Sequence, residues 1–158
     1  EMGLFDFLRK KKEIAQITDN DRQQFTDDMS ANANLLVKQF KDDAKLDFTI
    51  ESLREVDLII KDSIGFYKKA DPETKRKMII KIGAYVFEVA RKKFGGQYYW
   101  YNRLDQPILV TGQPEFEMSF LAYEKIRGCF ENGKQYKISP VFEDYALGIA
   151  NKSTLMIV

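Results

Sequence analysis

The stretch from residue 71 to residue 101 most constrains the fold, because it predicts a helix, a break and a strand in direct succession. Asp71 and Pro72 are typical of a helix N-cap and of a first helical position. Apolar side chains then recur at helical spacing, at Met78, Ile79, Ile82, Val86, Val89 and Ala90. Gly95 is expected to end this helix, and Gln97–Tyr101 follows as a strand with four consecutive aromatic residues.

The rest of the chain predicts more helix than strand. Helical spacing occurs at residues 21–44 and 53–69, and Ser139-Pro140 is a start signal for another helix. Residues 107–111 and 153–158 are expected to be strands. Residues 116–120 alternate like a strand, but the residues from 119 to 133 suit a helix, so that boundary stays open. We therefore expect a mainly helical α+β fold with a small antiparallel sheet, in a single domain over residues 19–158.

The N-terminal segment, residues 1–18, is expected to lie outside that domain. Within it, residues 2–12 place four apolar side chains beside Arg9 and three lysines. This composition is typical of an amphipathic segment that touches an anionic membrane surface. The same residues could instead form a helical turn or terminus whose aromatic side chains dock on the core.

Composition excludes several classes of site. The chain of 158 residues has no histidine and one cysteine, which removes Ser–His and Cys–His nucleophile pairs and most zinc sites. We expect no metal and no cofactor, since no phosphate-binding glycine motif or ligand spacing occurs. A net charge of +1 gives no reason to expect nucleic acid, and the basic cluster at residues 68–93 is interpreted as a solvated helix face. No secretory leader or apolar run of membrane-spanning length is evident, so a cytoplasmic location is expected.

Carboxylate chemistry is the enzymatic alternative that composition leaves open. Glu88 lies among apolar residues of the predicted helix, and Glu115 and Glu117 could supply a second carboxylate. The simpler interpretation is a glutamate at the core boundary that hydrogen-bonds a neighbouring strand or loop. The single Cys129 is expected to be a small buried core residue.

The aromatic strand offers a candidate partner surface. Successive side chains of a strand point to opposite faces, so Tyr98 and Trp100 should share one face and Tyr99 and Tyr101 the other. We expect Tyr99, Tyr101 and Arg103 to form a surface that binds another protein, because tyrosine and arginine are frequent interface anchors. The alternative is that both faces are covered and the hydroxyl groups find partners at the edge of the core.

The pattern Gly-x-Tyr-x-x-Glu-Val from Gly83, followed by Gly-Gly-x-Tyr-x-Trp ending at Trp100, resembles uncharacterised bacterial domain families. Some of these occur near polymorphic-toxin immunity proteins. Phe87 departs from the glycine usual there, and the families have no agreed catalytic residues. The resemblance implies a bacterial α+β domain. We expect a non-enzymatic protein-binding role, immunity- or adaptor-like, with carboxylate catalysis through Glu88 or membrane attachment through residues 2–12 as alternatives.

Overall fold

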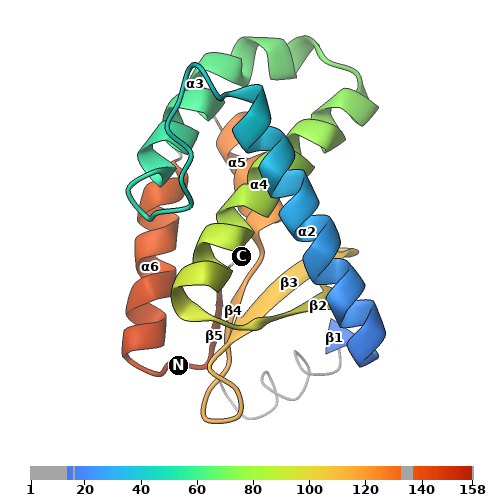
Figure 1. Ribbon diagram of the computed structural model, residues 1–158, viewed down its shortest axis with the longest axis vertical. Helices are drawn as coiled ribbons and strands as arrows, with labels where there is room; N and C mark the ends of the chain where they lie inside the picture. Colours follow the sequence, from blue (N-terminus) through green and yellow to red (C-terminus); the bar gives the residue numbers. More distant parts are fainter. Residues whose placement is uncertain (1–13, 16, 133–136, 158) are drawn as a thin grey trace.

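The computed structural model has the element order of a mainly helical α+β protein, as expected from the sequence (Figure 1). It describes residues 14–15, 17–132 and 137–157. The helices are α2 (Asp19–Gln39), α3 (Leu53–Lys69), α4 (Pro72–Phe94), α5 (Ala122–Glu131) and α6 (Ile138–Ala150). The strands are β1 (Ile14–Ala15), β2 (Gln97–Tyr101), β3 (Gln106–Thr111), β4 (Met118–Phe120) and β5 (Leu155–Ile157).

Helix α4 is the centre of the fold. The Asp71 carboxylate accepts a hydrogen bond from the Thr74 backbone N–H at 2.7 Å, Pro72 follows it, and Gly95 ends the helix with a φ of 78°. Every residue from 82 to 90 is buried, because α2, α3, α5 and the sheet all pack against this half of α4. The buried stripe predicted from the sequence is confirmed at Ile82, Val86, Val89 and Ala90, where burial extends to the whole helix circumference. Met78 and Ile79, which were predicted to belong to the same stripe, are only half-buried.

The sheet is mixed, with strand order β1-β2-β3-β4-β5. The first three pairings are antiparallel, but β4 and β5 run parallel. The expectation of a purely antiparallel sheet is therefore wrong at this edge, since α5 and α6 lie between β4 and β5 and a long connection can return the chain in the same direction. Ile14 and Ala15 lie opposite Tyr101 and Trp100, so part of the segment 1–18 belongs to the sheet.

The helices cover one face of the sheet (Figure 1). Tyr98, Leu109 and Phe120 point to this face and join the main core. Tyr101, Ile108, Val110 and Leu121 form a second, smaller cluster with Ile14, Tyr99 and Met156 packed against it. The alternation predicted for the aromatic strand is thus present.

Candidate functional site

A cavity of about 630 Å³ lies between α2, the first half of α4, α5 and the β2–β3 hairpin. Its aromatic residues are Phe25, Trp100 and Tyr123, and its cations are Lys75, Arg76 and Arg127. Ile79, Ile80, Pro72 and Pro107 complete most of its apolar wall. We call this cavity the aromatic pocket. Its volume lies within the range of about 300–1,000 Å³ that is usual for ligand sites.

The aromatic rings of the pocket are held by specific contacts. The rings of Phe25 and Trp100 are 5.8 Å apart between centroids, and the Trp100 indole N–H donates to Asp105 Oδ1 at 3.1 Å. The Tyr123 hydroxyl donates to the Met29 sulfur at 3.5 Å, and burial raises the pKa of Tyr123. Tyr123 packs so closely on Gly83 of α4 that a Cβ there would lie 2.4 Å from its ring carbon Cδ1. The apolar floor is therefore built from fixed side chains.

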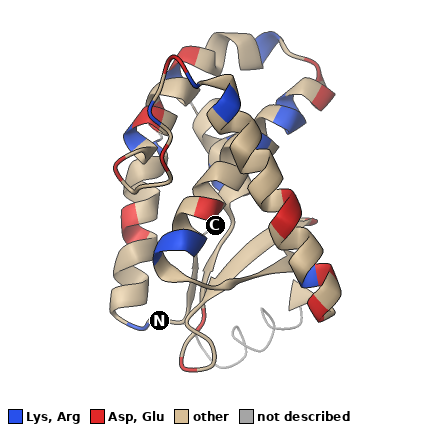
Figure 2. Cartoon of the chain, in the orientation of Figure 1, with Lys and Arg blue, Asp and Glu red and all other residues tan. Residues whose placement is uncertain are grey.

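The charges around the aromatic pocket are mainly positive. Lys75 and Arg76 form no ion pair with a described residue, whereas Arg127 pairs with Glu124. Asp105 is the acidic residue of the lining, and it already accepts the indole hydrogen bond. In Figure 2 the acidic residues at the start of α4 give way to basic ones, while the described strands carry no charged residue. The pocket thus combines an uncharged aromatic floor with a cationic rim.

Glu88 lies elsewhere, fully enclosed in the core, and does not line the aromatic pocket. Its Oε1 accepts from Ser30 Oγ at 2.5 Å and from Arg91 Nη2 at 2.9 Å. Its Oε2 accepts from Arg91 Nε at 2.6 Å and from the Tyr98 hydroxyl at 2.8 Å. The carboxylate therefore joins α2, α4 and β2.

The electrostatics of this cluster favour an ionised Glu88. Burial by itself would raise the pKa of Glu88, but the hydrogen bonds from Arg91, Ser30 and Tyr98 outweigh it and leave the pKa below its ordinary value. A general acid near neutral pH needs a raised pKa and access to substrate. Glu115, one expected partner, is exposed and pairs with Lys152 at 2.8 Å. The contacts of Glu88 are those of a structural residue, which was the simpler interpretation of the sequence.

The predicted partner surface is only partly accessible. Tyr101 is 3% exposed, so the expectation that it offers a free ring is wrong, because Tyr101 packs with Ile108, Val110 and Leu121. Tyr99 is half-buried, and its hydroxyl lies 3.1 Å from Gln97 Oε1 and 3.0 Å from Gln113 Oε1.

Arg103 is exposed in the β2–β3 turn, but the arginine that lies over the Tyr99 ring is Arg22 of α2, at 5.0 Å. The sequence analysis predicted that Arg103, from the turn next to β2, would accompany Tyr99, whereas the structure places Arg22 of α2 there. Sequence analysis also missed the aromatic pocket, because Phe25, Trp100 and Tyr123 come from three separate regions of the chain. The one local signal was the basic cluster that supplies Lys75 and Arg76.

The comparisons with known proteins give no match, whether to family models, curated proteins or solved structures. Among the described residues, no helix is both long and apolar enough to cross a bilayer. That same part of the chain contains no group of three or more cysteine and acidic residues able to hold a metal ion. The predicted amphipathic segment at residues 2–12 lies outside the described residues.

Proposed function

We propose that this chain is a non-enzymatic protein-binding domain and that its aromatic pocket receives an apolar side chain from an acidic segment of the partner. The observation that carries the proposal is the position of Trp100, half-buried in a cavity beside Phe25 and Tyr123. Tryptophan, tyrosine and arginine dominate binding energy at protein interfaces, especially where a side chain fills a pocket. An adaptor- or immunity-like role in a bacterial cell agrees with this site.

The charge of the rim supports an acidic partner. Lys75 and Arg76 lack ion pairs with described residues, so a carboxylate of a partner would not have to displace an existing one. A complementary charge mainly speeds encounter and rejects basic partners, while the buried aromatic contact provides affinity. The expected occupant is therefore a segment with an aromatic or aliphatic residue between acidic ones.

The fully hydrogen-bonded state of Glu88 argues against carboxylate catalysis. Glu88 is enclosed, ionised and shared among three donors, so it has no free position for a substrate proton. No observation on the described residues favours carboxylate catalysis through Glu88 over the binding of a partner protein.

A displayed library of random peptides tests the proposal. Selection on the wild-type chain should enrich peptides that carry an aromatic residue flanked by Asp or Glu. Such peptides should shift the emission of Trp100, the only tryptophan of the chain, and should lose at least tenfold in affinity with Arg76→Glu. Lys77→Glu is the matched control, since Lys77 is an exposed neighbour outside the lining. Enriched peptides without acidic bias, or with equal affinity for both variants, would contradict the proposal.

A further inference from the structure

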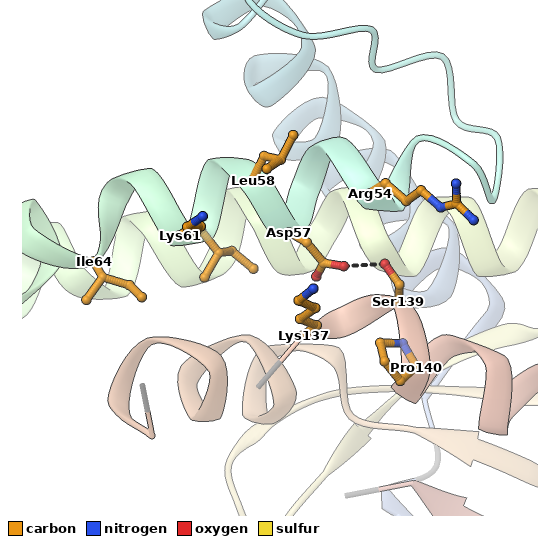
Figure 3. A pocket seen from close by; sticks show the side chains of 9 residues that line it. Arg54, Asp57, Leu58, Lys61, Ile64, Lys137, Ser139 and Pro140 are labelled. Carbon is orange, nitrogen blue, oxygen red and sulfur yellow. Dashed lines mark hydrogen bonds between the residues drawn. The ribbon is translucent and has the colours of Figure 1, made fainter. Parts of the chain in front are cut away.

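A second cavity, of about 670 Å³, lies between α3 and the beginning of α6 (Figure 3). One side of the cavity is formed along α3 by Ile64, Lys61, Asp57 and Arg54. The opposite side is formed by Lys137 and Pro140. Leu58 and Ile60 complete the apolar part of the lining. We call this cavity the α3–α6 pocket. It shares no residue with the aromatic pocket.

The single carboxylate of the α3–α6 pocket is already engaged. Asp57 Oδ1 accepts from the Ile138 backbone N–H at 2.7 Å, and Oδ2 accepts a short hydrogen bond from the Ser139 hydroxyl. Figure 3 shows Asp57 and Ser139 pointing toward one another across the gap between the two helices. Asp57 thus ties α6 to α3 and fixes one wall of the cavity.

The cations of the α3–α6 pocket are not engaged in this way. Arg54, Lys61 and Lys137 are exposed, and none of them forms an ion pair with a described residue. With Asp57 they leave the lining a formal charge of +2. Cations that surround a cavity without an anionic partner are placed to receive an anion from outside.

The apolar part of the lining defines the rest of the ligand. Ile60 is 3% exposed and lies at the base, whereas Leu58 is 52% exposed and lies at the rim. An exposed leucine beside three cations suits a molecule with an apolar stem and an anionic head. Covering Leu58, Ile64 and Pro140 with such a stem would remove apolar surface from water.

From this arrangement we infer that the α3–α6 pocket binds a phosphate monoester that carries an apolar group. A phosphate monoester has a charge between about −1.5 and −2 at pH 7, which matches the net charge of the lining. Lys61 and Lys137 hold the phosphate from opposite sides, Arg54 adds charge at one end, and the stem lies against Leu58 and Ile64. This site is independent of the partner proposed for the aromatic pocket.

Hexyl phosphate is the probe for this site, with binding measured by calorimetry and by backbone amide shifts of the full chain. Hexyl phosphate should shift the amides of Leu58, Lys61 and Ser139 and bind at least tenfold more tightly than hexanol or inorganic phosphate. Lys61→Gln and Lys137→Gln should each weaken binding roughly tenfold. Lys68→Gln is the matched control, because Lys68 is exposed on the same helix but outside the lining, and it should stay within twofold of wild type.

Asp57→Asn provides a variant that must act in the opposite direction. The amide oxygen still accepts from Ile138 N–H, while the negative charge beside the phosphate is removed, so hexyl phosphate should bind several-fold more tightly. Vesicles with phosphatidic acid that capture the chain only when Lys61 is intact would identify a lipid as the source of the phosphate. Hexyl phosphate binding without vesicle capture would identify a free metabolite.

Three results would overturn the inference. The first is the absence of amide shifts around the α3–α6 pocket at millimolar hexyl phosphate. The second is unchanged affinity in both Lys61→Gln and Lys137→Gln. The third is equal affinity for hexanoate, which would assign the cations to carboxylates in general.

Discussion

At the scale of single residues, the buried carboxylate of Glu88 connects three elements of the fold. Glu88 accepts hydrogen bonds from a serine of α2, an arginine of its own helix and a tyrosine of β2. A buried carboxylate is tolerated only when it is paired and hydrogen-bonded, because its hydration is lost. The sequence shows a glutamate among apolar residues, but neither Ser30 nor Tyr98 can be assigned to it from sequence spacing alone.

Glu88→Gln should lower the free energy of unfolding by about 2 kcal/mol at pH 7, because Arg91 loses its buried counter-charge. The pKa of Glu88 is lowered in the folded state, so its stabilising effect is complete above the ordinary value of 4.5 and is lost as the pH falls through the folded pKa. The gap between wild type and variant should therefore narrow below pH 4.5 in urea titrations.

Glu73→Gln serves as the control for this prediction. Glu73 pairs with Lys77 on the surface, where both side chains are more than half exposed, so its loss should cost less than about 0.5 kcal/mol. A stability gap for Glu88→Gln that is equal at pH 3 and pH 7 would contradict the assigned ionisation.

Gly83→Ala should destabilise the fold by about 1–3 kcal/mol, although alanine is the better helix former. The added Cβ would lie 2.4 Å from Tyr123 Cδ1, so the ring must move, and the aromatic pocket moves with it. Trp100 emission should therefore change along with the thermal midpoint. In the double variant with Tyr123→Leu the two effects should be clearly less than additive, and simple additivity would count against this contact.

At the scale of elements, local signals predict some helix ends and not others. The start of α4 can be predicted from Asp71 and Pro72 because the cap and the helix are adjacent in sequence. Ser139-Pro140 gives a similar signal for α6, but α6 begins one residue earlier, at Ile138. The backbone N–H of Ile138 donates to the carboxylate of Asp57, which belongs to α3. A cap that comes from another element produces no local sequence pattern. The two pockets could not be predicted from the sequence for the same reason, because their lining residues come from elements that are far apart along the chain.

Asp57→Ala should lower the free energy of unfolding by about 1–2 kcal/mol, since it leaves the first N–H of α6 without its carboxylate partner. Asp62→Ala, on the same helix, is the matched control, because Asp62 is exposed and forms no hydrogen bond with a described residue. Amide hydrogen exchange should speed up at the start of α6 in the first variant and not in the second. Equal exchange in both would mean that α6 does not depend on this cap.

At the scale of the whole molecule, the fold is organised around one helix that nearly every other element contacts. Composition and periodicity predicted the class and the buried residues Ile82, Val86 and Val89. They did not predict the parallel pairing of β5 with β4, since strand direction depends on where α5 and α6 return the chain. Because most of the buried side chains belong to one main core, the helices and the sheet are expected to be lost in one cooperative transition.

The single thiol of the chain, that of Cys129, allows the rate of cooperative opening to be measured. Cys129 is 3% exposed, and burial raises the pKa of its thiol to about 11, so a thiol reagent at pH 8 finds neither access nor thiolate in the native state. The rate at which the reagent modifies Cys129 should therefore report how often the core opens. Val86→Ala, which removes about 2 kcal/mol of packing, should label roughly 30-fold faster. The thiol of Cys129 thus reports how often the core opens, and mass spectrometry of the labelled chain measures that rate.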